Sequence, residues 1–292
     1  MKILVTGSNG QLGTELVNRY SERPNCELFV GDLPDIDITS ELSIASTFAS
    51  ISPDVVINCA AWTAVDAAEE KESSAFTVNA EGPAILATYC ARAGARLVQI
   101  STDYVFEGNA FEPYREDSQP GPITAYGRTK LSGENFVREL LPDNHLVIRT
   151  AWLYSPWSKN FAKTMTRLAL IGNGEVRVVN DQIGQPTSAT DLARQLVELS
   201  LSSSPAGIYH GTNSGQATWF EFAQEIFKLS GADVNRVIPV SSSEYLRPAK
   251  RPSYSVLSHD SWAKTTIKPM RDWQIALIDA MPAIISAVKA QG

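Results

Sequence analysis

Short apolar runs alternate with longer amphipathic segments along the first half of the chain. The apolar runs are rich in β-branched residues and predict strands at 2–6, 27–30, 55–59, 96–101 and 145–150. The segments between them have helical spacing of apolar residues and predict helices at 11–21, 40–50, 73–93 and 125–140. Strands and helices that alternate in this way build a parallel sheet with helices on both faces. The sequence therefore predicts an α/β fold with a Rossmann-type, doubly wound parallel sheet.

The pattern changes after residue 152. Helical segments dominate, the β segments at 176–179 and 208–210 are shorter, and the links are rich in Gly, Pro and Ser. We expect residues 151–292 to form mainly a smaller, interleaved C-terminal lobe, with some segments that return to the main sheet. An aromatic stripe at helical spacing predicts part of the core of this lobe. It consists of Trp219, Phe220, Phe222 and Phe227.

Composition narrows the classes of function. The chain has 25 Lys and Arg against 32 Asp and Glu, a net charge of -7, and no basic run, which argues against nucleic-acid or anionic-membrane binding. The apolar runs are too short to span a bilayer, and no secretion signal precedes the first strand, so we expect a cytoplasmic protein. Cys26, Cys59 and Cys90 are widely spaced, as are the three histidines, which predicts free thiols and argues against a zinc site or a His-based metal centre.

A glycine-rich turn joins the first predicted strand to the first predicted helix. Gly7, Gly10 and Gly13 have the spacing Gly-x-x-Gly-x-x-Gly, which differs from the common Gly-x-Gly-x-x-Gly fingerprint. Glycines here permit a tight turn and close approach of the backbone to a pyrophosphate, while the helix N-terminus supplies amide donors. The turn therefore predicts a dinucleotide site and makes residues 1–150 the NAD(P)-binding domain.

Two acidic residues follow the second predicted strand. Asp32 lies 19 residues after Gly13, close to the distance at which a carboxylate binds the adenosine ribose hydroxyls. A negative charge there disfavours the extra phosphate of NADPH, so we expect NADH as the preferred cofactor and NADPH as the alternative. Asp37, followed by Ile38, is placed to contact the adenine edge, and the alternative is an Asp that caps the next helix or is solvated.

A Tyr-x-x-x-Lys pair marks a candidate catalytic helix. Tyr126 and Lys130 share one face of the predicted helix 125–140, where the ammonium can lower the pKa of the phenol and make it a usable proton donor or acceptor. The strand 96–101 runs into Ser101 and Thr102, and such strand ends face the ligand crevice of an open α/β sheet. Thr102 is then placed to hydrogen-bond the substrate oxygen that Tyr126 protonates.

Two features of the second half are candidates for substrate binding. Arg247 and Arg251 lie in a cationic loop, and guanidinium groups bind phosphate through a bidentate fork, so they are candidates for the substrate diphosphate. The alternative is an exposed basic loop with no ligand. Trp152 follows a strand end and is either a sugar-stacking residue or a core residue.

Six ordered motifs resemble one known family. They lie at 7–13, 58–66, 101–108, 126–134, 149–152 and 180–187. Together they cover nearly the whole chain, which is identified as a member of the extended short-chain dehydrogenase/reductases and is most similar to the dTDP-4-dehydrorhamnose reductases among them. The resemblance implies NAD(P)H-dependent reduction of the C4 keto group of dTDP-4-dehydro-6-deoxy-L-mannose to dTDP-L-rhamnose. Trp62, where the family often has His or Tyr, and Cys59, in place of a common Ala, are local departures.

The resemblance also implies the roles of individual residues. The expected catalytic residues are Tyr126, Lys130 and Thr102. The expected cofactor contacts are Gly7, Gly10, Gln11, Leu12, Gly13, Asp32, Asp37, Ile38, Ala61, Trp62, Thr63, Tyr126 and Lys130. The expected substrate contacts are Thr102, Asp103, Trp152, Arg247 and Arg251. Some relatives dimerise around Mg²⁺ through acidic residues, so Mg²⁺ stays open as a cofactor with no ligand assigned, and both a monomer and a homodimer stay open.

Three alternatives keep the fold and change the function. An epimerase or dehydratase is disfavoured, because dehydratases tend to carry an Asp-Glu pair where this chain has Asp103-Tyr104. A reductase of a related nucleotide-linked 4-keto-6-deoxy sugar remains open, since a few pocket contacts decide one hydroxyl configuration. The third alternative is a non-catalytic regulatory subunit on the same fold. The presence of Thr102, Tyr126 and Lys130 argues against it.

Overall fold

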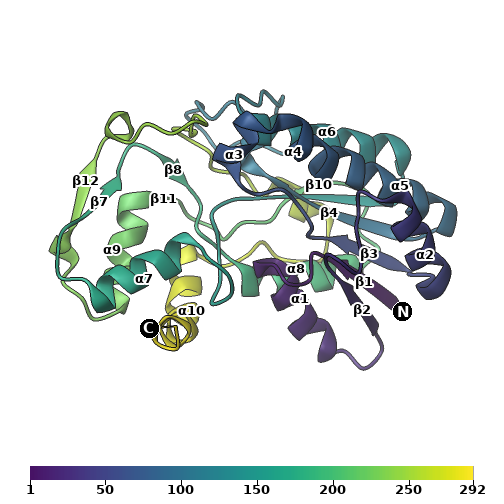
Figure 1. The fold of residues 1–292 in the computed structure, drawn as a ribbon, viewed down its shortest axis with the longest axis horizontal. Coiled ribbons are helices and arrows are strands. Elements are labelled where there is room, and N and C mark those ends of the chain that lie inside the picture. Colours follow the sequence, from purple (N-terminus) through teal and green to yellow (C-terminus); the bar gives the residue numbers. More distant parts are fainter. Residues whose placement is uncertain (292) are drawn as a thin grey trace.

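A six-stranded, all-parallel sheet forms the larger part of the molecule (Figure 1). The computed structural model describes residues 1–291. The strand order across the sheet is β2-β1-β3-β4-β5-β10. The strands are β1 (Lys2–Thr6), β2 (Glu27–Gly31), β3 (Val55–Asn58), β4 (Arg96–Thr102), β5 (His145–Thr150) and β10 (Gly207–His210). The prediction of a Rossmann-type parallel sheet is confirmed.

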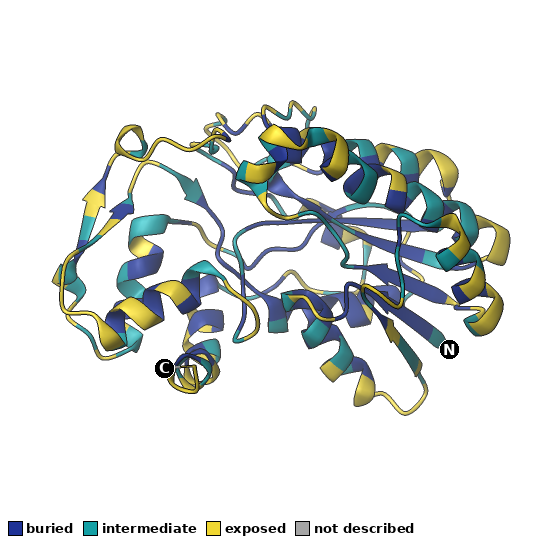
Figure 2. Cartoon of the chain, viewed as in Figure 1, coloured by how far each residue is buried: buried dark blue, intermediate teal, exposed yellow. Residues whose placement is uncertain are grey.

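Helices cover both faces of this sheet because successive side chains of each strand point to opposite sides. Ile3 and Val5 of β1 belong to a core with α1 (Gln11–Ser21) and α8 (Ala189–Ser200). Leu4 between them belongs to the opposite core, which contains α2 (Glu41–Ile51), α5 (Gly82–Ala93) and α6 (Ala125–Leu140). Figure 2 shows the central strands buried between these two layers, with the edge strand β2 more exposed.

The prediction of a single helix at 73–93 is wrong. The chain forms α3 (Val65–Glu70) and α4 (Glu72–Phe76), then a π-helical turn, Thr77–Glu81, before α5 begins at Gly82. The π turn presents Asn79, which is 1% exposed and hydrogen-bonds both the backbone N–H and the carbonyl of Trp62. The interruption therefore ties this segment to the loop that follows β3.

The smaller lobe packs around its own hydrophobic core. That core includes Phe222 and Phe227, both fully buried as predicted. It joins α7 (Phe161–Ile171), α9 (Trp219–Leu229) and α10 (Trp273–Lys289). Short strand pairs complete the lobe: β6 (Leu153–Tyr154) with β9 (Thr187–Ser188), β7 (Val176–Val179) with β12 (Val237–Val240), and β8 (Ile183–Gly184) with β11 (Ala217–Thr218).

Two segments from beyond residue 150 lie in the larger part of the molecule. Strand β10 pairs in parallel with β5, and α8 packs beside α1. The chain therefore crosses between the two parts more than once, and the assignment of 1–150 to the cofactor and 151–292 mainly to the substrate stays a prediction. No helix within residues 1–291 combines the length and the apolar character needed to cross a bilayer.

Candidate active site

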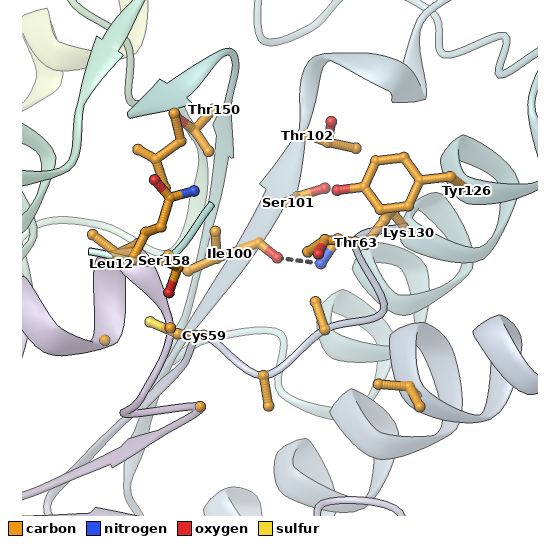
Figure 3. Close-up of a pocket in the computed structure, with 18 of the residues that line it drawn as sticks. Leu12, Cys59, Thr63, Ile100, Ser101, Thr102, Tyr126, Lys130, Thr150 and Ser158 are labelled. Atoms are coloured by element: carbon orange, nitrogen blue, oxygen red, sulfur yellow. Dashed lines mark hydrogen bonds between the residues drawn. The ribbon is translucent and has the colours of Figure 1, made fainter. Parts of the chain in front are cut away.

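A cavity of about 700 Å³ lies between the carboxyl ends of the sheet strands and the smaller lobe. Its walls come from the glycine turn, the end of β4, helix α6 and the segment 150–161 of the lobe (Figure 3). Fifteen of the predicted site residues line it: Gly7, Gly10, Gln11, Leu12, Gly13, Asp32, Asp37, Ile38, Ala61, Thr63, Thr102, Asp103, Tyr126, Lys130 and Trp152. Residues scattered over 150 positions of sequence thus share one cavity.

The glycine turn has no room for side chains. Gly7 has a positive φ of 66°, and a Cβ there would lie 2.5 Å from the backbone nitrogen of Ala60. A Cβ on Gly13 would lie 2.2 Å from the carbonyl oxygen of Gly7. The turn therefore brings β1 and the start of α1 into backbone contact, and Gly10 is the N-cap residue of that helix. Such a helix N-terminus in a cavity wall fits a pyrophosphate, because its first amides point outward and its dipole favours negative charge.

The acidic residues after β2 are fixed by backbone donors. Asp32 accepts hydrogen bonds from the backbone N–H groups of Asn9 at 3.1 Å and Leu33 at 2.8 Å. Its carboxylate thus stands beside the glycine turn, as a ribose-binding acid would. Asp37 accepts from the backbone N–H and the hydroxyl of Thr39, whereas Ser40 caps α2. The helix-capping interpretation of Asp37 is therefore wrong.

Tyr126 and Lys130 project from α6 into the cavity (Figure 3). The helix begins at Thr124, whose side chain accepts from the backbone N–H of Gly127. The Lys130 ammonium donates to the carbonyl of Ile100 at 2.6 Å, and burial lowers the pKa of Lys130 to about 8. Burial raises the pKa of Tyr126 to about 12, and the group that lowers this pKa is the Thr102 hydroxyl and not, as the sequence predicted, the Lys130 ammonium.

Polar groups gather where β4 and β5 end. The Thr102 hydroxyl donates to Asp103 at 3.0 Å and accepts from the backbone N–H of Tyr104 at 3.2 Å. Burial raises the pKa of Asp103 to about 6. Within residues 1–291, the hydroxyl of Thr150 is buried without a hydrogen-bond partner, whereas the Ser255 hydroxyl stabilises the charged form of Asp103. An unpaired polar atom on a cavity wall is costly unless a polar ligand satisfies it, so the end of β5 fits such a ligand.

Sequence reasoning assigned no role to Thr150. Its signal was available, because it is a hydroxyl residue at the carboxyl end of a parallel strand, directly opposite Thr102 in the register of β4 and β5. Asn79 was also missed. It holds Trp62 through two hydrogen bonds and donates to Thr129 of α6 at 3.2 Å, so it fixes the 59–63 loop against the catalytic helix. No local pattern marks that residue.

The lobe and the link that leads into it contribute an aromatic wall. Trp152, Phe161 and Trp219 all line the cavity. The assignment of Trp219 purely to the core was wrong: it packs on the core but also faces the cavity, because it is the first residue of α9. The same segment of the lobe contacts the glycine turn, since the Gln11 side chain accepts from Ser155 at 3.0 Å and Asn160 at 2.9 Å.

Three predicted residues lie off the cavity wall. Trp62 packs with Tyr126 in a small cluster behind the wall, and its indole donates to the carbonyl of Ala64. Arg251 forms an ion pair of 2.9 Å with Asp66 of α3, and Arg247 is exposed. Their cofactor and substrate roles stay predictions. Among the described residues, no three His, Cys, Asp or Glu side chains cluster as a metal site would require.

Comparison with known proteins gives matches over nearly the whole chain. A dTDP-4-dehydrorhamnose reductase of Streptomyces griseus is 47% identical over 285 residues, which cover 96% of this chain and 93% of that protein. A probable dTDP-4,6-dihydroxy-2-methyloxan-3-one 4-ketoreductase of Streptomyces antibioticus is 44% identical, with 98% of this chain and 97% of that protein covered.

A solved structure agrees with these relatives. The crystal structure of a dTDP-4-dehydrorhamnose reductase from Bacillus anthracis, in complex with NADP, is 39% identical. It superposes with a TM-score of 0.90 and covers 96% of this chain and 98% of that one. The family model described as the RmlD substrate binding domain matches residues 1–285. With the resemblance of its six motifs thus confirmed, the chain belongs to the RmlD family.

Proposed function

We propose that this protein is an NAD(P)H-dependent reductase of a dTDP-linked 4-keto-6-deoxy sugar. The substrate that we favour is dTDP-4-dehydro-6-deoxy-L-mannose, and the product is dTDP-L-rhamnose. One observation carries the proposal. The same cavity is lined by a glycine turn that fits a pyrophosphate and by Tyr126, Lys130 and Thr102. The names of the relatives from Streptomyces griseus and Bacillus anthracis support the choice of sugar.

The residues of this chain provide the acid and the charge stabilisation of such a reaction. When bound, the reduced nicotinamide supplies the hydride for C4. Tyr126 donates its phenolic proton to the oxygen of C4 as the C=O bond becomes C–OH, and the Lys130 ammonium, held by the carbonyl of Ile100, stabilises the phenolate that remains. Thr102 donates to the same oxygen after its hydroxyl turns away from Asp103.

We also propose that NADH is preferred over NADPH. Asp32 places a carboxylate where the adenosine ribose would lie, and a 2′-phosphate there would meet a like charge. Among the described residues, Lys130 and Lys159 are the cations that line the cavity, and neither follows β2. NADPH remains the alternative cofactor, because the relative from Bacillus anthracis was crystallised in complex with NADP.

A second candidate is a 4-ketoreductase of a related dTDP-linked sugar. The Streptomyces antibioticus relative, at 44% identity over nearly the whole chain, carries such a name. The catalytic residues serve either substrate equally, because both reactions add a hydride and a proton to a C4 ketone. The configuration of the sugar is then decided by the walls that hold it.

The test is loss of absorbance of the reduced nicotinamide when the purified protein is mixed with NADH or NADPH and dTDP-4-keto-L-rhamnose, followed by identification of the sugar. We expect oxidation of the cofactor and formation of dTDP-L-rhamnose. Tyr126→Phe should abolish turnover and keep cofactor binding, whereas Tyr89→Phe, a matched change on α5 outside the cavity, should leave turnover intact. No oxidation by a protein that binds the cofactor would refute this substrate and favour the related sugar.

A further inference from the structure

A row of buried polar side chains crosses three strands of the larger sheet. Thr6 lies opposite Asn58 in the register of β1 and β3, and Asn58 lies opposite Gln99 in the register of β3 and β4. The three residues are at most 2% exposed. Side chains at opposed positions of neighbouring strands lie on the same face of a sheet. Polar groups in such an interior are costly unless each has a partner, so the partners of this row indicate what it supports.

Hydrogen bonds join the row from end to end. The Thr6 hydroxyl donates to Oδ1 of Asn58 at 2.7 Å, and Nδ2 of Asn58 donates to Oε1 of Gln99 at 2.8 Å. Nε2 of Gln99 then donates to the backbone carbonyl of Ile100 at 2.9 Å. Oδ1 of Asn58 also accepts from the backbone N–H of Ala60 at 3.2 Å. The row therefore connects the start of the glycine turn and the 59–63 loop with the end of β4.

The row ends on the carbonyl that also binds the Lys130 ammonium. Nζ of Lys130 donates to the Ile100 carbonyl at 2.6 Å, as Figure 3 shows. The pairing of β3 with β4 stops at Asn58 and Gln99, one residue before Ile100. Beyond that point the Gln99 amide and the Lys130 ammonium are the side-chain donors to this oxygen. The direction of the Ile100 carbonyl therefore depends on Gln99 as well as on Lys130.

Lys130 needs this carbonyl because its ammonium is buried. The residue is 3% exposed, and burial lowers its pKa, whereas the charges of Glu134 and Cys59 act in the opposite direction. Tyr126 lies one helical turn before Lys130 on the same face of α6. A carbonyl that accepts a hydrogen bond from an ammonium favours its charged form. If the Ile100 carbonyl turned away, the ammonium would lose its acceptor and could move relative to Tyr126.

We propose that Gln99 is a positioning residue: its amide directs the Ile100 carbonyl and so keeps the Lys130 ammonium in place for the proton transfer. The rest of the row fixes the orientation of this amide, because Asn58 donates to its oxygen and leaves its nitrogen for the carbonyl. Support that is set before the substrate binds does not have to reorganise during the reaction. The inference rests on the proposed function, and Gln99 acts through Lys130, since it does not line the cavity itself.

Gln99→Met tests the proposal in turnover, because Met has a similar volume and lacks the amide. We expect kcat for the keto sugar to fall roughly tenfold, as a small misplacement of a catalytic group would cause, and the alkaline fall of kcat to begin at lower pH. Gln195→Met is the matched control: Gln195 is 5% exposed, donates to the Lys268 carbonyl at 3.1 Å and does not line this cavity. A Gln99→Met pH profile that coincides with the wild-type profile, or an equal loss in Gln195→Met, overturns the proposal.

A titration of Lys130 gives a reading that needs no substrate. In ¹³C nuclear magnetic resonance of protein labelled at the lysine Cε atoms, the Lys130 signal is the one that is absent from Lys130→Met. We expect the midpoint of its titration to lie at lower pH in Gln99→Met than in the wild type, and to be unchanged in Gln195→Met. An unchanged midpoint in Gln99→Met overturns the positioning role. A lower midpoint, found together with a wild-type protein that does not reduce the keto sugar, refutes only the proposed reaction.

A paired variant covers the case in which Gln99→Met does not fold. In the single variant Nδ2 of Asn58 loses its acceptor, and an unpaired donor in the interior is costly. Gln99→Met combined with Asn58→Leu removes both partners of that hydrogen bond, so it should be tolerated better. The paired variant must show the same lower midpoint for Lys130, and a wild-type midpoint in it overturns the proposal.

Discussion

The ion pair between Glu134 and Arg149 offers the sharpest test of how the site is supported. Glu134 of α6 accepts from Arg149 Nη2 at 2.7 Å and from Nε at 3.0 Å, and from the Ser101 hydroxyl at 2.5 Å. Both charged side chains are at most 1% exposed. The pair joins the catalytic helix to β5 and to the end of β4, and it lies directly behind the strand ends that form the cavity wall.

Removal of Glu134 alone should destabilise the protein strongly. In Glu134→Leu the guanidinium keeps only a 3.5 Å contact to the carbonyl of Glu116 and the ring of Phe106 at 4.8 Å. An unpaired buried charge of this kind costs about 3–5 kcal/mol. Glu72→Leu is the matched control for an exposed ion pair. Glu72 pairs with Arg128 of α6 at an equally short distance, but both side chains are almost half exposed. Exposed pairs contribute less than about 1 kcal/mol.

Urea unfolding followed by tryptophan fluorescence measures both losses from the shift in midpoint at a shared slope. The double variant Glu134→Leu with Arg149→Met should recover most of the loss, because it removes the unpaired charge and refills the volume with apolar atoms. Two results would refute the reasoning: a loss in Glu134→Leu no larger than in Glu72→Leu, or a double variant as unstable as the single one.

Three further predictions concern the cavity. Because burial lowers the pKa of Lys130 to about 8, kcat should fall as the pH rises above that value and the ammonium loses its proton; a profile that is flat to alkaline pH would contradict this. Asp32→Asn should raise the ratio of kcat/KM for NADPH over NADH by at least about tenfold, because a like charge near the 2′-phosphate is removed, and an unchanged ratio would place the adenosine ribose elsewhere. Asn79→Ala should cost roughly 1–3 kcal/mol in urea unfolding, since two partly buried backbone groups of Trp62 lose their partner.

The parts of the fold that the sequence predicted are those with a strong local signal. The buried strands are short apolar runs, and β1 and β5 begin and end at the predicted residues. The π turn at Thr77–Glu81 carries no such signal, because its conformation depends on the contacts of Asn79 with Trp62 and Thr129, which lie 17 and 50 residues away. A period of 3.6 residues indicates a helix there and does not reveal where it breaks.

The residues of the candidate site also differ in how strong a sequence signal they carry. Residues at the ends of strands and at helix starts, such as Gly10, Thr102 and Tyr126, could be predicted because topology brings these ends together. Arg251 shows the limit of a charge argument: its partner Asp66 is 185 residues away, and no spacing rule connects the two. Trp219 shows the limit of periodicity. The helical period predicts that a residue lies on the buried face of a helix, but it does not predict that the first residue of that helix also lines a cavity.

Under the proposed function, catalysis and selectivity would draw on different parts of the molecule. Tyr126, Lys130 and Thr102 stand on α6 and β4 of the sheet domain, whereas Phe161 and Trp219 come from the lobe and Trp152 from the link between them. The two Streptomyces relatives, both more than 40% identical to this chain, carry names that specify different substrates. A change in the aromatic wall can alter which sugar face is accepted without touching the proton donor, and only a few contacts are needed to discriminate between such sugars. Exchanges confined to the aromatic wall formed by Trp152, Phe161 and Trp219 should change the KM for one sugar relative to another and leave the pH dependence of kcat as it is.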